Sequence, residues 1–226
     1  MSYVGVDACR KGWVAVVIDD AEGDASGVFV PRLEDLSDGV PDASGIAIDI
    51  PIGLPRSGRR RADALARQQV GARRNSVFFT PVREALVAAT HREANAASLQ
   101  LTGQGISQQA YALRTKILEA ELFVASHPVP VWEVHPELSF TVLLGHPPSA
   151  SKKTWAGMRE RVGALEAVGI RLDDLGGAGV AAAVDDVVDA AAAAWSCRRL
   201  VNGDAVSFPD PPEKDPETGR PVAIWA

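Results

Sequence analysis

The fold is decided by the stretch Val4-Gly5-Val6-Asp7-Ala8-Cys9-Arg10-Lys11-Gly12-Trp13-Val14-Ala15-Val16-Val17-Ile18-Asp19. Two apolar runs flank a short polar turn that contains Gly12, and the valines favour strand over helix. The stretch predicts an antiparallel hairpin, and its weak alternation predicts that both faces are buried. Asp7 is the exception, because a carboxylate on a buried strand is unfavourable unless a partner such as a metal ion compensates it. We expect the rest of the chain to bring further carboxylates to Asp7.

Length, composition and charge limit the classes of protein to which this chain can belong. The 226 residues are 46% hydrophobic and carry a formal net charge of −6. That content is sufficient for one large domain, and the net charge gives no overall basic signature of nucleic-acid binding. Cys9 and Cys197 make no disulfide framework, so we expect reduced thiols and a cytoplasmic protein. We expect no signal peptide, and the Ala/Val-rich stretch 178–195 contains aspartates, so we expect no membrane span.

Further strand signals follow the hairpin. A short third strand is predicted at 27–30 and a short helix at 32–38. Ser44-Gly45-Ile46-Ala47-Ile48-Asp49-Ile50 predicts the next strand, which Pro51-Ile52-Gly53-Leu54-Pro55 ends because proline cannot continue a ladder. Asp49 therefore lies at the carboxyl end of a strand, where open α/β sheets bind ligands.

The chain changes character after this strand. Segment 56–125 lacks strand signals and predicts a helical insertion. The expected helices of the insertion lie at about 59–70, 82–98 and 106–125. A strand is expected at 129–134, and helices at about 136–144, 153–168 and 181–200. The proline-rich tail, 203–226, ends in Val222-Ala223-Ile224-Trp225, which we expect to form a small edge hairpin with Val206 and Phe208.

This order of elements predicts a ribonuclease H-like α/β fold. Three antiparallel strands would be followed by parallel strands in one mixed sheet, flanked by helices and interrupted by the helical insertion. We expect a single domain over residues 1–226. The sequence leaves the oligomeric state open, a homodimer included.

Acidic residues occur where this sheet would end. If the strands of Asp7 and Asp49 are neighbours, the two carboxylates are about 5 Å apart. The run Asp185-Asp186-Val187-Val188-Asp189 would add a third contribution, because at about 100° per residue Asp189 falls between Asp185 and Asp186 on a helix. Val184, Val187, Val188, Ala191 and Trp195 would occupy the opposite arc. Such carboxylates suit Mg²⁺ or Mn²⁺, and two cations about 4 Å apart would favour phosphodiester displacement. The predicted metal ligands are Asp7, Asp49, Asp186 and Asp189.

Each acid also has a structural interpretation that stays open. Asp185 is a favoured type of helix N-cap. Asp186 in a first turn would complement the helix dipole. Asp49 before proline would suit a turn.

Glu133-Val134-His135-Pro136-Glu137 ends the late strand and should face the same site. Glu133 would be a further metal ligand or a base for the attacking water, which adds it to the candidate catalytic residues. His135 and Glu137 would hold substrate or support the ligands. The alternative for Glu137 is that of a first-turn helix acid after Pro136.

The insertion is rich in arginine, with phenylalanines among the arginines. Guanidinium groups suit phosphate oxygens and aromatic faces suit unstacked bases. We therefore expect substrate contact from Arg61, Arg67 and Arg74, and an extension of this surface by Lys152. The alternative is a solvated helix face, or arginines paired with the chain's acids. The stretch of arginines and phenylalanines comprises Arg56, Arg59, Arg60, Arg61, Arg67, Arg73, Arg74, Phe78, Phe79 and Arg83.

Several motifs occur together in this chain. They are Val4-Gly5-Val6-Asp7 with Gly12-Trp13-Val14, Ile48-Asp49-Ile50-Pro51-Ile52-Gly53-Leu54-Pro55, Arg61-Ala62-Asp63 with Arg67, Ser76-Val77-Phe78 with Thr80-Pro81, Glu133-Val134-His135-Pro136-Glu137-Leu138-Ser139-Phe140, and Asp186-Val187-Val188-Asp189-Ala190. This set resembles the predicted nuclease family of ribonuclease H fold called domain of unknown function 429, and the resemblance covers roughly residues 3–200. It implies a ribonuclease H-like fold and metal-dependent nuclease chemistry, with the acidic roles at Asp7, Asp49, Asp186 and Asp189.

Two functions of different classes follow. The first is a metal-dependent nuclease or phosphodiesterase that hydrolyses nucleic acid or a nucleotide-like ester. The second is a non-catalytic nucleic-acid-binding module in which the acids are structural. An actin-like or sugar-kinase-like ATPase would need a second phosphate-binding copy of the core, which the sequence lacks, and no phosphate-binding Gly-x4-Gly-Lys-Ser/Thr loop is present.

Overall fold

The computed structural model describes residues 1–20 and 23–226. Its main sheet has the strand order β4-β2-β1-β5-β6. Strands β4, β2 and β1 are antiparallel, and β1, β5 and β6 are parallel. The predicted mixed sheet is therefore confirmed, including the parallel pairing of the two strands that precede Asp7 and Asp49. The strands are β1 (Ser2–Cys9), β2 (Gly12–Asp19), β4 (Ser26–Val30), β5 (Ala43–Ile48) and β6 (Val131–Glu133).

Both faces of the sheet are buried, as the weak alternation in the hairpin predicts. Along β1, Tyr3 packs with the cluster around α10 (Val184–Asn202), whereas Val4 and Val6 pack on the opposite face. That opposite face is covered by the short 3-10 helix η1 (Leu33–Asp35), α1 (Leu36–Gly39) and α6 (Arg114–Ser126). Because successive side chains alternate across a strand, Gly5 and Asp7 share the α10 face with Tyr3.

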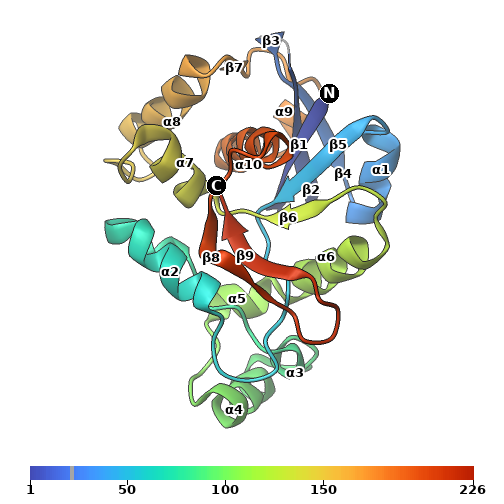
Figure 1. The fold of residues 1–226 in the computed structure, drawn as a ribbon, viewed down its shortest axis with the longest axis vertical. Coiled ribbons are helices and arrows are strands. Elements are labelled where there is room, and N and C mark those ends of the chain that lie inside the picture. The colour runs from blue at the N-terminus through green and yellow to red at the C-terminus, as the bar shows by residue number, and fades with distance from the viewer. Residues whose placement is uncertain (21–22) are drawn as a thin grey trace.

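The insertion forms the end of the molecule opposite the N-terminus (Figure 1). The expected helix over 82–98 is wrong: it is two helices, because the Thr90 hydroxyl accepts from Glu93 N while the Glu93 carboxylate accepts from Thr90 N, and this capping box starts a new helix. The expected helix over 106–125 is also divided, at Leu113. Besides α6, the insertion contains α2 (Arg61–Gln69), the 3-10 helix η2 (Gly71–Ser76), α3 (Arg83–Leu86), α4 (His91–Thr102) and α5 (Gln108–Ala112).

The last helices lie beside α10. Helix α7 (Pro136–Leu144) follows β6, and α8 (Trp155–Ala167) is capped by Thr154, whose hydroxyl accepts from Gly157 N. The short helix α9 (Ala178–Ala181) precedes α10, and the two-residue strands β3 (Gly23–Asp24) and β7 (Ile170–Arg171) pair in parallel.

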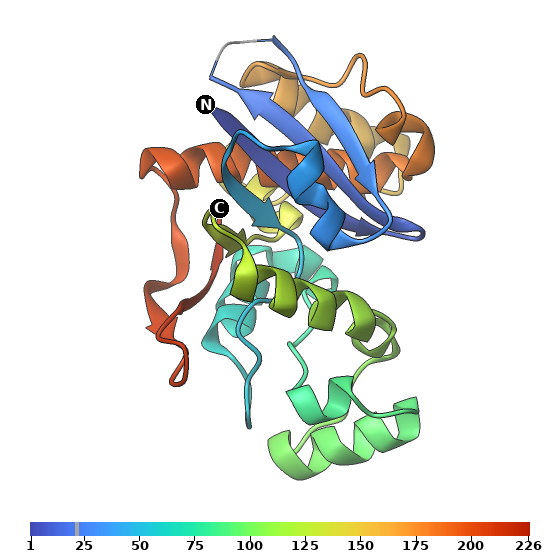
Figure 2. The same cartoon turned by 90° about the vertical axis from the view of Figure 1, so that its right-hand side faces the viewer.

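The predicted C-terminal hairpin is confirmed. Strands β8 (Ser207–Lys214) and β9 (Pro221–Trp225) are antiparallel, and Trp225 forms a parallel bridge with Val134 that places the hairpin beside β6. Figure 2 shows the hairpin and the insertion on the same side of the main sheet.

Two further expectations concern cysteines and membranes. Cys9 and Cys197 are both buried free thiols, as expected. Within residues 1–20 and 23–226, no helix has the length and apolar character that crossing a membrane requires.

Candidate functional site

Asp7 and Asp49 meet at the carboxyl edge of the sheet. The paired register of β1 and β5 ends at Val6 and Ile48, and the next residue on each strand is an aspartate. The backbone N–H of Asp49 donates to Val6 O at 2.9 Å, which fixes the chain as it leaves β5. The sheet therefore sets the separation of the two carboxylates through backbone hydrogen bonds.

Helix α10 brings the third carboxylate. Its run of alanines from Ala190 to Ala194 is buried against the sheet, and a Cβ on Gly5 would lie 2.0 Å from Ala190 O. Only glycine at this position allows the helix backbone to approach so closely. Asp189 directly precedes the alanine run, so the close approach places its carboxylate beside Asp7, on the same face of the sheet.

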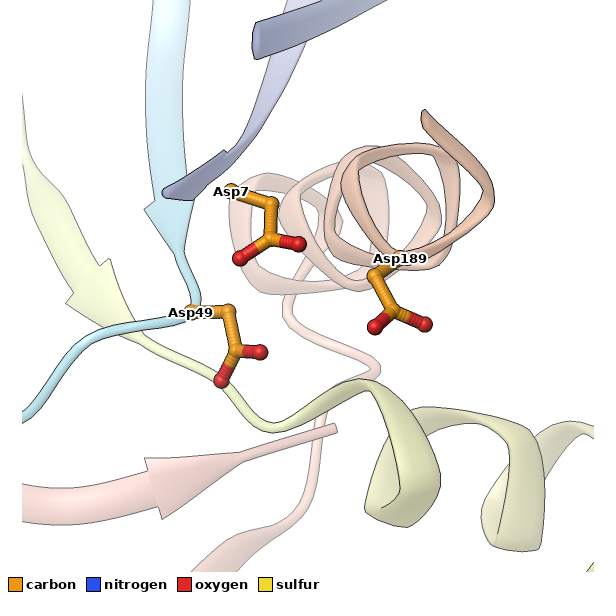
Figure 3. Close-up of side chains that lie close together, drawn as sticks. All are labelled: Asp7, Asp49 and Asp189. Atoms are coloured by element: carbon orange, nitrogen blue, oxygen red, sulfur yellow. The ribbon is translucent and has the colours of Figure 1, made fainter. Parts of the chain in front are cut away.

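The three carboxylates converge (Figure 3). One oxygen from each of Asp7, Asp49 and Asp189 can be chosen so that all three lie within 4.8 Å of one another. Asp7 and Asp189 are only 7% and 2% exposed, and Asp49 is half-buried. We call these three residues the acidic triad. Among the described residues, it is the one group of at least three Asp, Glu, His or Cys side chains with this geometry.

The electrostatics of the acidic triad disfavour three full negative charges. Burial, and to a smaller extent Asp49 and Asp189, raise the pKa of Asp7 well above its usual range. Burial also raises the pKa of Asp49 and of Asp189 to about 7, while Lys152 opposes both shifts. Like charges close together in a buried place destabilise one another, and a cation between them removes that penalty.

Lys152 is the nearest cation to the acidic triad. Its Nζ donates to Asp189 Oδ2 and lies 3.9 Å from Asp185 Oδ2. Burial lowers the pKa of Lys152, but the carboxylates, Asp189 first among them, outweigh burial and raise it overall. One ammonium group cannot neutralise three carboxylates, so the site retains capacity for a further cation.

Asp185 does not cap α10, whereas Asp186 lies in the first turn of the helix, as its structural interpretation expects. The N-cap of α10 is Ala183, so the interpretation of Asp185 as the cap is wrong, and Asp185 instead accepts from Lys153 Nζ. Asp186 lines the same cavity as the acidic triad but is not one of its converging carboxylates. Val184, expected on the apolar arc of the helix, is exposed because it lies at the first position of α10.

The acidic triad opens into a cavity of about 370 Å³. His135, Glu137, Lys152 and Asp186 line it, as predicted for a shared site. His135 Nε2 faces Ser76 O at 3.4 Å, whereas His135 Nδ1 is buried without a protein hydrogen-bond partner. Burial lowers the pKa of His135. Ser76 Oγ is likewise buried and without a partner, and buried polar atoms of this kind point to a ligand or water in the cavity.

Glu133 belongs to a separate ionic network. Its Oε1 and Oε2 each accept from the Arg60 guanidinium at 2.7 Å, and Oε2 also accepts from Ile52 N at 2.7 Å. Arg60 is shared with Asp63, whose Oδ2 accepts from Thr80 N at 2.8 Å. The geometry thus engages both oxygens of Glu133 and does not bring them to the acidic triad as metal ligands or as a base.

Glu137 also has a dedicated partner. Arg161 Nη2 lies 2.7 Å from both carboxylate oxygens, and the Arg161 side chain is completely buried. Arg161 in turn donates to Gly157 O and Ala150 O. This pair joins α7 to α8, and it fixes the part of the chain that carries Lys152.

The three predicted phosphate-binding arginines lie in different surroundings. Arg61 is exposed, 3.6 Å from Glu213, and lies away from the acidic cavity. Arg67 donates to Val77 O and packs against Phe79. Arg74 is exposed on η2. None of the three lines the acidic cavity. The alternative of pairing with acids applies to Arg56, Arg61 and Arg83, which pair with Glu217, Glu213 and Glu121.

Sequence reasoning missed the roles of Arg60 and Arg161. Arg60 resembles the other arginines of its stretch, although an acid three residues later, Asp63, is a local sign of pairing. Arg161 has no local sign, because its partner Glu137 is 24 residues away.

The donor set suits a hard divalent cation. Three carboxylates supply only oxygen ligands, the type that Mg²⁺, Mn²⁺ and Ca²⁺ prefer. The raised pKa values and the unpartnered His135 Nδ1 fit a cavity that receives a charged ligand.

Comparison with known proteins gives the family and no activity. No curated protein matches the chain. The model of a family described as a protein of unknown function (DUF429) matches residues 5–214, which include every member of the acidic triad. The chain therefore belongs to the DUF429 family.

Proposed function

We propose that this protein is a metal-dependent phosphodiesterase of ribonuclease H-like fold that cleaves nucleic acid. The observation that carries the proposal is the convergence of Asp7, Asp49 and Asp189 from two parallel strand ends and one long helix. The antiparallel-then-parallel sheet, with its acids at the carboxyl edge, is consistent with that fold. Ligands of open α/β sheets bind at this edge.

The acidic triad would hold Mg²⁺ or Mn²⁺. Such a cation, when bound, polarises a phosphoryl oxygen and neutralises charge that develops there. Asp186, half-buried on the same cavity wall, offers a further oxygen one helical turn before Asp189. The carboxylates themselves orient and bind, and Lys152 keeps Asp189 in place.

His135 supplies a proton acceptor. Ser76 O can only accept a hydrogen bond, so His135 Nε2 must carry the proton of the neutral ring, and Nδ1 is then the free acceptor. The lowered pKa favours this neutral form. His135 lines the cavity, so we assign it the role of holding substrate or supporting the metal ligands from the cavity wall.

Glu133 and Glu137 act indirectly in this proposal. The Arg60 network fixes the chain just after Asp49, at Ile52, and just before His135, at Glu133, and the Glu137–Arg161 pair fixes α7 against α8. Both arrangements hold the ligands in position without using their own carboxylates for chemistry.

The test compares wild type with Asp7→Asn and with Asp38→Asn, an exposed control on α1. Each is incubated with labelled single-stranded DNA, duplex DNA and RNA in Mn²⁺, Mg²⁺ or excess chelator. We expect Mn²⁺- or Mg²⁺-dependent cleavage by wild type and Asp38→Asn, and a loss of at least about a hundredfold in Asp7→Asn, the size seen when transition-state charge stabilisation is removed.

Calorimetric titration with Mn²⁺ separates catalysis from simple binding. We expect Asp7→Asn to remain folded by circular dichroism and to lose at least about tenfold in affinity for Mn²⁺, since one of three ligands is replaced. Cleavage that persists in chelator, or equal activity in Asp7→Asn, would defeat the proposal. Binding of nucleic acid without divalent-ion binding would favour the non-catalytic module.

A further inference from the structure

A second cavity adjoins the acidic one. Its volume is about 360 Å³, and it is lined by the insertion and the loop that precedes α2. The two cavities share wall residues, so they are contiguous. The shared residues are Asn75, Val77, Phe78, Thr80 and Gln109.

The two cavities have opposite charge. The acidic triad dominates the first, whereas the described wall of the second contains Arg59 and Arg67 and no carboxylate. An anionic chain that places one phosphate at the acidic cavity, where a cation is needed, would therefore find a positive subsite for its neighbouring nucleotide.

Phe79 organises the positive charges of the second cavity. The guanidinium carbon of Arg59 lies 3.6 Å from the centre of the Phe79 ring, and that of Arg67 lies 4.9 Å from it. Arg67 is fixed a second time by its hydrogen bond to Val77 O. A guanidinium that packs on an aromatic ring keeps its edge N–H groups for phosphate oxygens, and its planar surface can stack on a base.

The boundary between the cavities carries two side-chain amides. Asn75 on η2 and Gln109 on α5 are both exposed and line both cavities. An amide offers donors and an acceptor together, which is what the hydrogen-bonding edge of an unpaired base requires. Phe78 adds an aromatic side chain to the wall that the two cavities share.

Size decides the form of the substrate. Ligand pockets span about 300–1,000 Å³, so each cavity is at the small end and suits a unit of roughly one nucleotide. The major groove of a DNA duplex is by itself about 12 Å wide. A duplex with its bases paired is therefore too large to enter either cavity. Two adjoining small cavities therefore fit consecutive nucleotides of an unpaired strand.

We propose that the cavity lined by Arg59, Arg67 and Phe79 binds the unpaired nucleotide adjacent to the bond that is cut, so that the substrate is single-stranded nucleic acid or an unpaired strand end. The position of this subsite next to a cleaved bond rests on the proposed phosphodiesterase function, whereas the binding of an unpaired nucleotide does not depend on it. Arg59 and Arg67 contact the backbone phosphate, and Asn75 and Gln109 contact the base.

The experiment measures binding without catalysis. A fluorescently labelled pentathymidylate and a blunt duplex of mixed sequence are titrated with wild-type protein in excess chelator, with anisotropy as the readout. The variants are Arg59→Gln, whose side chain is exposed, and Phe79→Ala. The matched control is Arg92→Gln on α4, an exposed arginine that lines neither cavity.

We expect wild type and Arg92→Gln to bind the single strand at least tenfold more tightly than the duplex. Arg59→Gln should lose about tenfold in affinity for the single strand, and the slope of log affinity against log salt should fall by about 0.7, the value for one phosphate contact on a single strand. Phe79→Ala should lose about tenfold as well, because both guanidiniums lose their support.

Equal affinity for single strand and duplex, or unchanged binding in Arg59→Gln, would overturn the inference even if Mn²⁺-dependent cleavage is found. Conversely, a preference for the single strand that depends on Arg59, without any cleavage, would support the subsite and defeat the catalytic proposal. If Phe79→Ala does not fold, Arg59→Gln alone decides the question.

Discussion

Two groups of buried carboxylates face the same cavity, and they differ in how their charge is compensated. Glu133 and Asp63 share the Arg60 guanidinium at hydrogen-bond distance. Within residues 1–20 and 23–226, the acidic triad has a single paired cation, Lys152, which binds one of its three members. The first group is a complete internal ion network, whereas the second lacks positive charge.

The difference separates structural acids from ligand-binding acids. Burial alone does not, since Asp63 and Glu133 are as buried as Asp7 and Asp189. A buried ion pair with all its hydrogen bonds made is stable by itself, and breaking it leaves an uncompensated charge. A buried acidic group without matching cations instead gains stability when a cation arrives from solution.

The largest expected effect comes from breaking the complete network. Arg60→Met should reduce the free energy of unfolding by about 3–5 kcal/mol, because Asp63 and Glu133 are then left buried and unpaired. Urea denaturation measures it. The neighbouring Arg61→Met removes an exposed arginine, 67% accessible, and should change stability by less than about 1 kcal/mol.

A second substitution distinguishes lost charge from lost packing. If charge is the cause, Glu133→Gln in the Arg60→Met background should recover at least about 1 kcal/mol, since interacting residues are coupled. A loss of under about 1 kcal/mol in Arg60→Met would contradict the view that Arg60 is structural.

Gly5→Ala should separate the acidic triad while leaving the Arg60 network intact. The new Cβ would meet the backbone of α10 at 2.0 Å, so the helix must move away from β1. We expect a loss of about 3 kcal/mol, at the upper end for overpacked cores, and a loss of Mn²⁺ affinity. The control is Gly163→Ala on α8, where a Cβ would meet no atom within 4 Å. Wild-type Mn²⁺ affinity in Gly5→Ala would show that α10 does not set the geometry.

The smallest expected effect is on pH dependence. With the pKa values of Asp49 and Asp189 at about 7, the native protein without a cation holds protons that the unfolded chain has already released. The stabilisation from this protonation is present at low pH and is lost as pH rises towards about 7. The free energy of unfolding in chelator should therefore fall over that range.

The same protons compete with cations. Mn²⁺ affinity should fall below pH 7 by up to about tenfold per pH unit for each proton displaced, or about 1.4 kcal/mol, and should level off above pH 7. Calorimetry in two buffers of different ionisation enthalpy counts the protons. An affinity independent of pH between 5 and 8 would mean that the triad carboxylates are already ionised.

Most of the sheet and the acidic triad could be predicted from sequence because their signals are local. The apolar runs that end at Asp7 and Asp49 predict strands with acids at their carboxyl ends, and the parallel pairing of these neighbouring strands brings the two acids together. Asp189 was found from helical spacing, but the choice between Asp186 and Asp189 depends on the depth to which α10 packs. Gly5 on β1 sets that depth, so the depth cannot be predicted from the sequence of the helix alone.

The insertion was less predictable, because an arginine in a sequence can bind phosphate, pair with an acid or lie exposed to solvent. Arg60 and Arg61 are adjacent in sequence, yet the first is buried in an ion network and the second is exposed. The distinction depends on Glu133, which lies 73 residues from Arg60. Charged side chains with distant partners give no periodic signal, so neither the Arg60–Glu133 pair nor the contact of Arg67 with Phe79 could be derived from spacing.

The backbone hydrogen bond from Asp49 to Val6 affects which substitutions this protein can tolerate during evolution. The carboxylates of Asp7 and Asp49 are spaced by the ladder between β1 and β5, and the ladder does not depend on which apolar side chains fill the core. Substitutions among the valines and isoleucines of these strands can therefore accumulate while the acids keep their separation. The separation of Asp7 and Asp49 is insulated from such changes, whereas the position of Asp189 still depends on the packing of α10 against Gly5.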